Sequence, residues 1–258
     1  MLAVAPATVL GDGLTIATAA SLGPMFAEIG ALYESRYADR VTLVVASSGN
    51  LARQIEYGAP FDLFASANES WVARLVRSGV IDPETTTYGL GRLVLLLDPR
   101  LPPPAAEGMA GSDGTIGKKA LARLADADIR YVAIANPRHA PYGRAAKEVL
   151  QSAGLWQALE SKRVYAENIR QAVQFVDSGN AEAGLAALSF VRSTRARWWL
   201  IDASLHAPLR QTLGVVQDSP NKASAKRFMA IMASEDVAAI LRKFGFDPVE
   251  DDAPGVQR

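Results

Sequence analysis

The amino-acid sequence predicts an α/β protein in which mostly parallel sheets are flanked by helices. Short apolar runs typical of buried strands, such as residues 14–20 and 41–46, alternate with stretches whose apolar residues recur at helical spacing. Strands that alternate with helices form parallel sheets, because each helix returns the chain to the start of the next strand. The alternation begins again near residue 131, which predicts a second unit of the same kind.

The first part of the chain contains several predicted strands. They lie at residues 14–20, 41–46, 62–67 and 93–97. The helix before the last of these strands carries Trp71, Leu75 and Val80 and is closed by Gly79. The prolines within residues 99–104 predict a surface loop.

The remainder of the chain repeats this organisation. Its strands are predicted at residues 131–135, 164–166, 184–188 and 213–216. Its helices are predicted after the loop at 136–143, from Ile169 onward, and over 223–232 and 237–244. Gly89 and Gly91 lack the rest of a dinucleotide-binding fingerprint, so we interpret residues 89–91 as a hinge or turn.

Composition limits the class of function. The 258 residues include 27 basic and 27 acidic side chains, with an isoelectric point near 6.8. This balance argues against a nucleic-acid partner, which requires a basic face. Because the sequence has no cysteine and only two histidines, disulfides and thiolate metal sites are excluded, and a histidine-based metal cluster is not expected.

Residues 1–13 are interpreted as a leader segment. The sequence contains no apolar stretch long enough to cross a bilayer. The segment has no basic region, but residues 3–7 contain small-x-small patterns that resemble cleavage sites. It fits equally a truncated export signal and a leader without fixed structure.

Two serines stand where a predicted strand ends and a helix begins. Ser21 follows the first strand and Ser48 follows the second, and Tyr142 and Ile169 stand at two later helix starts. Free backbone N–H groups and the positive end of the helix dipole make such junctions anion sites without net charge. Since ligands bind at the carboxyl ends of parallel strands, these positions can meet around one small oxyanion. A serine at a helix start is also commonly an N-cap, and that alternative stays open.

Several longer motifs surround these junctions. They are AASL at 19–22, SSGNLARQI at 47–55, GAPFDLFASA at 58–67, NPRHAPYG at 136–143 and FGF at 244–246. With these motifs the chain resembles, from about residue 14 to about residue 248, the substrate-binding proteins of bacterial molybdate ABC transporters. The resemblance implies a two-lobe type II periplasmic binding protein fold with the ligand in the interlobe cleft. Together with the repeated strand–helix pattern it predicts a discontinuous lobe I (14–91 plus 212–258) and a lobe II (92–211).

The resemblance also implies which residues bind the ligand. The hydroxyls of Ser21 and Ser48 and the backbone N–H groups of Tyr142 and Ile169 would contact the oxyanion. It implies no catalytic residue, no cofactor and no metal site beyond these contacts to the molybdate oxyanion. Some members add a tyrosine hydroxyl, and the matching position here is Ala187, so that contact is missing or is supplied by another group.

The function implied by the resemblance is that of a non-enzymatic, exported receptor. It would capture molybdate or tungstate in the periplasm, act as a monomer and deliver the ion to the membrane permease of an ABC transporter. A receptor for another tetrahedral oxyanion, such as sulfate or chromate, is an alternative. Others are a cytosolic anion sensor and an enzyme on the same fold, although the sequence offers no convergent set of acid, base and nucleophile.

Other residues near the motifs have simpler interpretations. Arg53 and Arg138 are expected at the surface, because a full positive charge in the site would weaken selection by size. His139 stands alone, without a nucleophile at known spacing, so catalysis is not expected of it. Trp198 and Trp199 are interpreted as packing at an apolar surface, with contact to a membrane permease as the alternative.

Overall fold

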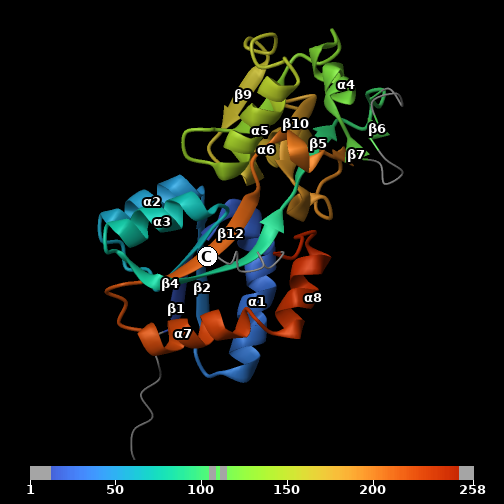
Figure 1. Ribbon diagram of the computed structural model, residues 1–258. Helices are drawn as coiled ribbons and strands as arrows, with labels where there is room; N and C mark the ends of the chain where they lie inside the picture. Colours follow the sequence, from blue (N-terminus) through green and yellow to red (C-terminus); the bar gives the residue numbers. More distant parts are fainter. Residues whose placement is uncertain (1–12, 105–108, 111–114, 250–258) are drawn as a thin grey trace, which may run out of the picture.

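The computed structural model describes residues 13–104, 109–110 and 115–249, so the leader predicted at 1–13 lies outside the described residues except for Gly13. It contains two five-stranded sheets, each accompanied by helices (Figure 1). A third, two-stranded sheet of β6 (Met109–Ala110) and β7 (Thr115–Ile116) lies beside the second. Within these residues no helix has both the length and the apolar character needed to span a bilayer.

The first sheet has the strand order β2-β1-β3-β12-β4. Its strands are β1 (Leu14–Ala19), β2 (Val41–Ala46), β3 (Leu63–Ser66), β4 (Ile81–Gly91) and β12 (Leu209–Val216). Strand β1 runs parallel to both β2 and β3, whereas β12 is antiparallel to β3 and β4. Because the register pairs Ala19 with Ala46, the carboxyl ends of β1 and β2 lie at the same level.

Helices cover both faces of the first sheet. They are α1 (Gly23–Arg36), α2 (Ser48–Glu56), α3 (Glu69–Arg77), α7 (Lys222–Ile231) and α8 (Glu235–Lys243). Side chains alternate between the faces of a strand. Leu14 and Ile16 of β1 therefore pack in the core that contains Phe26 of α1, whereas Ala17 packs in a separate core with Leu51 of α2.

The second sheet has the strand order β11-β5-β10-β8-β9. Its strands are β5 (Leu93–Leu97), β8 (Val132–Ala135), β9 (Arg163–Ala166), β10 (Ala183–Ala187) and β11 (Arg197–Leu200). Strand β8 is parallel to β9 and β10, and β5 is antiparallel to β10 and β11. Helices α5 (Pro141–Ser152) and α6 (Ile169–Asp177) both pack against β8 and β10.

Several short helices complete the described structure. They are α4 (Lys118–Leu121), η1 (Ala20–Leu22), η3 (Ala122–Ala125), η4 (Leu188–Phe190) and η5 (Ala203–Leu205). The first of these, η1, connects β1 to α1, so the chain enters α1 through a tight turn at Ser21.

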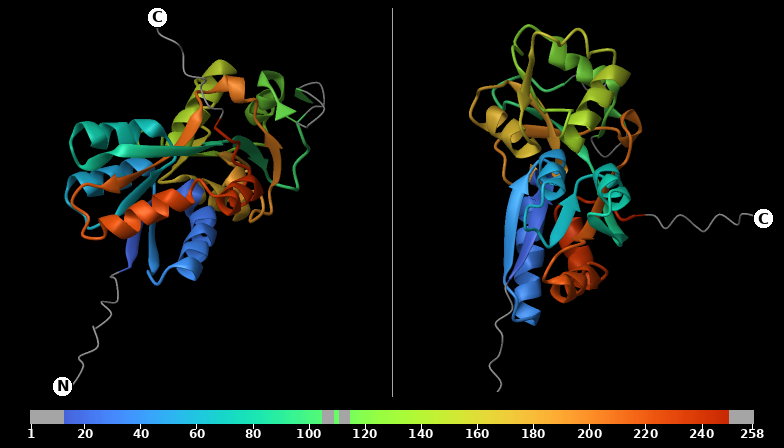
Figure 2. Two further views of the ribbon diagram at one scale, coloured as in Figure 1. Left: turned by 60° about the horizontal axis from the view of Figure 1, so that its bottom comes forward. Right: turned by 90° about the vertical axis from the view of Figure 1, so that its left-hand side faces the viewer.

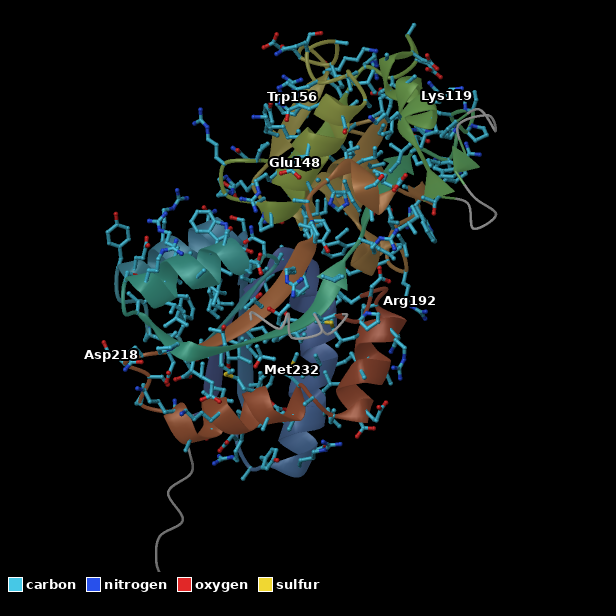
Figure 3. All side chains as sticks on the ribbon, in the orientation of Figure 1. Lys119, Glu148, Trp156, Arg192, Asp218 and Met232 are labelled. Carbon is cyan, nitrogen blue, oxygen red and sulfur yellow. The ribbon has the colours of Figure 1, made fainter. Side chains whose placement is uncertain are left out.

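The chain passes between the two sheets twice. Strand β4 is followed, after Arg92, by β5 of the second sheet, and the chain returns from β11 into β12. Strands β4 and β12 pair with each other, with Leu209 opposite Gly91, so the two connections lie side by side (Figures 1 and 2). Glu148 of α5, labelled in Figure 3, accepts a hydrogen bond from the N–H of Ala207 (2.8 Å), which attaches the returning segment to the second sheet's helices.

The α/β class with two helix-flanked sheets is confirmed, but the sheets are mixed rather than mostly parallel. Each contains two parallel and two antiparallel pairings. The antiparallel pairings all involve β4, β5, β11 or β12, the strands next to the two connections. The strands β4 and β11 were not predicted.

Some local predictions were wrong. Residues 89–91 form the end of β4 and not a turn, because they pair with β12. Val80 lies beyond α3: Gly79 has a φ of 74°, and the N–H of Val80 bonds the Leu75 carbonyl (2.9 Å), so the chain leaves the helix there. Leu188 belongs to η4 and not to the preceding strand.

Candidate functional site

A small cavity lies where the helix starts of the two sheets face each other. The space among its lining residues that a water-sized sphere can occupy is only about 10 Å³. The residues that line it are Ala19, Ala20, Ser21, Ser47, Ser48, Ala67, Ala140, Pro141, Tyr142, Asn168 and Ile169. The structure therefore brings together all four residues that the sequence predicted as ligand contacts. Their binding of an anion stays a prediction.

Strand direction explains why these segments meet. The parallel strands β1, β2 and β3 carry Ser21, Ser48 and Ala67 just beyond their carboxyl ends. The parallel strands β8 and β9 likewise precede the starts of α5 and α6, where Tyr142 and Ile169 lie. The carboxyl edges of the two sheets thus face one cavity, which is the usual ligand position in open α/β sheets.

The starts of three helices contribute backbone N–H groups to this region. The first N–H groups of a helix have no partner within the helix, and the helix dipole places partial positive charge there. Ser47 is the N-cap of α2, and Ala140 precedes Pro141 at the start of α5. Asn168 caps α6 by accepting a hydrogen bond from the N–H of Gln171 (3.1 Å). These ends favour an anion without any charged side chain.

The two predicted serine hydroxyls are buried and do not cap their helices. Ser21 is 1% exposed and Ser48 is fully buried. Neither η1, α1 nor α2 has a side-chain capping hydrogen bond, and the N-cap residue of α2 is Ser47. The alternative that these serines are ordinary N-caps is therefore wrong.

The surroundings of the two hydroxyls leave hydrogen atoms for a ligand. Ser48 Oγ accepts a hydrogen bond from the N–H of Ala67 (3.1 Å), so its own hydrogen remains to be donated. Ser21 Oγ has no well-formed hydrogen bond to any residue that the structure describes. A buried hydroxyl without a partner is costly, which favours a ligand that accepts from it.

The cavity wall carries no charged side chain. None of its lining residues is Asp, Glu, Lys, Arg or His. Arg53 and Arg138 are exposed, as predicted, and Arg53 donates to the side chain of Asn50 on the same helix. Selection of a ligand must therefore rest on hydrogen-bond donors, shape and the helix ends. Among the described residues no cluster of His, Asp or Glu could hold a metal ion.

Hydrogen bonds across the cavity rim join the two sheets' ends. The N–H of Gly49 donates to the carbonyl of His139 (2.9 Å), and Ser47 Oγ lies 3.0 Å from His139 Nδ1. The hydroxyl of Ser189 in η4 donates to the carbonyl of Ser21 (2.7 Å). Burial, and then the charge of Arg53, lower the pKa of His139. These contacts show the two sets of helix starts in direct contact.

Sequence reasoning missed the residues that make these rim contacts. Ser47, His139 and Ser189 bond to segments far away along the chain, so no local pattern reveals them. The glycine at position 49 is a local sign of these contacts. A Cβ there would lie 2.8 Å from the carbonyl oxygen of His139 and 2.7 Å from the Trp71 ring. Only glycine permits this approach without a shift.

Ala187 and the tryptophan pair have the following places. Ala187, where some relatives were expected to carry a tyrosine, ends β10 and is fully buried outside the cavity lining. Trp199 packs against the main core, in line with the packing interpretation, whereas Trp198 is 43% exposed on β11.

A family model covers almost all of the described chain. Residues 14–247 match the family described as bacterial extracellular solute-binding protein. The chain belongs to this family. It is 33% identical over 232 residues to the molybdate-binding protein ModA of Rhodobacter capsulatus, covering 89% of this chain and 86% of that protein. It is 30% identical to the molybdate-binding protein ModA of Escherichia coli over 236 residues, covering 90% and 88% of the two chains.

Two solved structures share the fold. The periplasmic molybdate-binding protein of Azotobacter vinelandii superimposes with a TM-score of 0.79 at 28% identity, covering 92% of this chain and all of that chain. The sulfate-binding protein SubI of Mycobacterium tuberculosis superimposes with a TM-score of 0.71 at 15% identity, over 93% and 88% of the two chains. The second similarity concerns the fold alone.

Proposed function

We propose that this protein is a receptor that captures molybdate or tungstate and delivers the ion to an ABC transporter. The observation that carries the proposal is the neutral cavity in which the buried hydroxyls of Ser21 and Ser48 face the helix starts at Tyr142 and Ile169. The molybdate-binding relatives, at about 30% identity over nine-tenths of the chain, support the choice of ion.

The physical chemistry of the ion fits such a cavity. Molybdate and tungstate are tetrahedral dianions at neutral pH, so every oxygen accepts hydrogen bonds and none donates. Charge-assisted bonds are strong in a site of low dielectric constant, and several converging neutral donors can replace a basic side chain. Protonated phosphate is disfavoured, because its O–H would face another donor.

We further propose that capture is a closure of two lobes. Lobe I comprises residues 14–91 plus 212–258, and lobe II comprises residues 92–211. The pairing of β4 with β12 beside both connections supports a hinge at this place. The ion would be held by Ser21 and Ser48 from lobe I and by the N–H groups of Tyr142 and Ile169 from lobe II, so binding favours the closed state.

The location and the partners of the protein follow from this proposed function. We expect it to act outside the cytoplasm, in the periplasm, as an exported monomer without enzymatic activity or a cofactor, and to release its ion to the membrane permease of the transporter. The family description as extracellular solute-binding supports the location.

Titration calorimetry with molybdate, tungstate, sulfate and phosphate tests this function. We expect tight binding of molybdate and tungstate at a stoichiometry of one ion per chain, with weak binding of sulfate and none of phosphate. Preferred binding of sulfate would assign the protein to another class of oxyanion receptor. No binding of any of the four ions would refute the proposal.

A further inference from the structure

The two serine hydroxyls of the cavity differ in what lies behind them. Ser48 Oγ accepts a hydrogen bond from the backbone N–H of Ala67, so its lone pair is occupied and its hydrogen can point toward the cavity. No backbone N–H of the described residues donates to Ser21 Oγ. A serine that donates to an anion is best oriented when another group donates to its oxygen, because each bond polarises the next.

The side chain of Tyr142 lies where such a group is needed. Its ring extends from the start of α5 to the hinge strand β4, so that a Cβ on Gly91 would be 2.1 Å from Tyr142 Oη. Tyr142 is 2% exposed, and it lines the same cavity as Ser21. Burial raises the pKa of Tyr142, and the neighbouring Ser21 lowers it in part. The phenol therefore stays protonated in the folded protein and is available as a donor.

We propose that Tyr142 is a positioning residue whose hydroxyl donates to Ser21 Oγ, which leaves the Ser21 hydrogen to be donated to the bound oxyanion. Both residues line the same small cavity, so the bond joins two groups that the fold has already brought together. The inference concerns the phenol and not the backbone N–H of Tyr142, and it rests on the proposed oxyanion-binding function. The ligand class is a tetrahedral dianion that accepts from every oxygen.

The sequence left open which group replaces the tyrosine hydroxyl that is missing at Ala187, and the hydroxyl of Tyr142 can take part of that role. Ala187, at the end of β10, offers no hydroxyl, whereas Tyr142 supplies one from α5, a helix that packs on the same sheet. Tyr142 belongs to the second sheet's helices and Ser21 to the first sheet, so the hydrogen bond forms only when the two are in contact. Ser189, also from the second sheet, holds the carbonyl of Ser21 at the same time (2.7 Å). The pair thereby couples ion binding to closure.

A double-mutant cycle between Tyr142 and Ser21 tests the proposal. Molybdate affinity is measured by calorimetry for the parent, Tyr142→Phe, Ser21→Ala and the double variant. We expect Tyr142→Phe to bind molybdate about 3- to 10-fold more weakly, the range of one neutral hydrogen bond. In the Ser21→Ala background the same change should have no further effect, because the phenol acts through Ser21. The melting temperature of the ligand-free protein should be unchanged by Tyr142→Phe.

Tyr88→Phe is the matched control. The Tyr88 hydroxyl is also buried on β4 and has no hydrogen-bond partner among the described residues, but Tyr88 does not line the cavity. Burial, and then the neighbouring Tyr142, raise the pKa of Tyr88, so this variant removes a buried hydroxyl close to Tyr142 without touching the cavity wall. We expect this variant to bind molybdate like the parent in both backgrounds. An equal loss in Tyr88→Phe would show that any buried hydroxyl lost near the hinge weakens binding, and it would overturn the specific role of Tyr142.

A second variant moves the hydroxyl without removing it. In Gly91→Ala the new methyl group would meet Tyr142 Oη at 2.1 Å and Gln211 Nε2 at 2.8 Å, so the ring must shift. We expect a loss of affinity similar to that of Tyr142→Phe, and little additional loss when the two changes are combined. If the parent binds molybdate but Tyr142→Phe binds equally well, the proposal is wrong and the proposed function stands. If the parent binds no oxyanion, the function itself fails.

Discussion

At the scale of single residues, two buried serine hydroxyls are the groups that we expect to contact the ligand through their side chains. Ser21 and Ser48 lie within one cavity, yet their environments differ, since only Ser48 Oγ receives a backbone N–H. Removing each hydroxyl should therefore change ligand binding in the same direction and protein stability in different directions.

Ser21→Ala and Ser48→Ala are each expected to weaken molybdate binding by about 1.5–3 kcal/mol, the contribution of a hydrogen bond to a charged partner. Ser48→Ala should also reduce the free energy of unfolding by about 1–3 kcal/mol, because the buried N–H of Ala67 loses its acceptor. Ser21→Ala removes a hydroxyl without a partner, so its stability should equal or exceed that of the parent. Calorimetry and urea denaturation of ligand-free protein measure the two effects. Parent-like affinity in both variants would contradict the assignment of these serines.

A charged cluster away from the cavity makes stability depend on pH. The side chains of Ser224, Tyr33 and Arg227 lower the pKa of Asp39. The Tyr33 hydroxyl donates a hydrogen bond to Asp39 (2.8 Å), and Arg227 forms an ion pair with the same carboxylate (2.7 Å). Burial of Tyr33, and then its hydrogen bond to Asp39, raise the pKa of Tyr33 to about 12. A depressed carboxyl pKa contributes stability above the ordinary pKa of aspartate, and this contribution is lost as pH falls through the lowered value.

We expect Asp39→Asn to lower the free energy of unfolding at pH 7. Between about pH 5 and about pH 2, the range in which aspartate usually titrates, the variant should lose less additional stability than the parent. Urea denaturation across this range checks the prediction. Asp82→Asn is a suitable control, since Asp82 lies on β4, outside the hydrogen bonds that join Asp39 to Tyr33 and Arg227. If the parent and Asp39→Asn lose stability in parallel, Asp39 makes no contribution of this kind.

The contact between the start of α2 and the loop before α5 belongs to the scale of elements. Gly49, the second residue of α2, donates to the His139 carbonyl and has no room for a side chain against His139 and Trp71. Alanine favours a helix over glycine by about 1 kcal/mol, so the helix itself gains from the substitution while the contact is lost.

Gly49→Ala is therefore expected to weaken molybdate binding about tenfold, as for about 1.4 kcal/mol of lost contact. It should not raise the melting temperature of the ligand-free protein, because the new Cβ would also lie 2.7 Å from the ring of Trp71 on α3. Gly23→Ala is the matched control: it also stands at a helix start, but its Cβ would meet Val45 at an ordinary 3.6 Å. Calorimetry and thermal unfolding of both variants decide the matter. Equal affinities in the two variants would show that the Gly49 contact does not contribute to binding.

The elements that the sequence predicted well are those whose pattern is local. Strands β1, β2, β5 and β8 are apolar runs, and helices begin close to Ser21, Ser48 and Ile169 because turn residues mark them. Strand β4 was missed because residues 82–87 are polar or proline on a half-exposed strand, which is stabilised by pairing with the distant β12. The candidate site was predictable because its residues follow strand ends. Its rim contacts were not, since Ser47 and His139 are 92 residues apart along the chain.

At the scale of the whole molecule, we expect the arrangement of the two sheets to couple ion binding to a change of shape. Cavity residues come from the helix starts and loops of both sheets, and the sheets are connected beside the paired strands β4 and β12 and through contacts at their facing ends. An ion that bridges the two sides therefore favours the compact arrangement by as much as its affinity differs between the open and closed states.

Selectivity and closure can be predicted together from this arrangement. Molybdate and tungstate have nearly the same size and charge, so we expect similar affinities, with sulfate at least about 100-fold weaker. That ratio requires a difference of about 2.7 kcal/mol in binding free energy. Imperfect contacts of the smaller sulfate can supply it, because donors that the helix starts hold in place cannot move inward to meet the shorter sulfur–oxygen bonds. Small-angle scattering with and without molybdate should show a smaller radius of gyration in the bound protein, and a competition titration gives the sulfate ratio. Equal affinity for sulfate would contradict selection by size. Tight binding without compaction would leave the ion assignment intact and exclude closure as the means of capture.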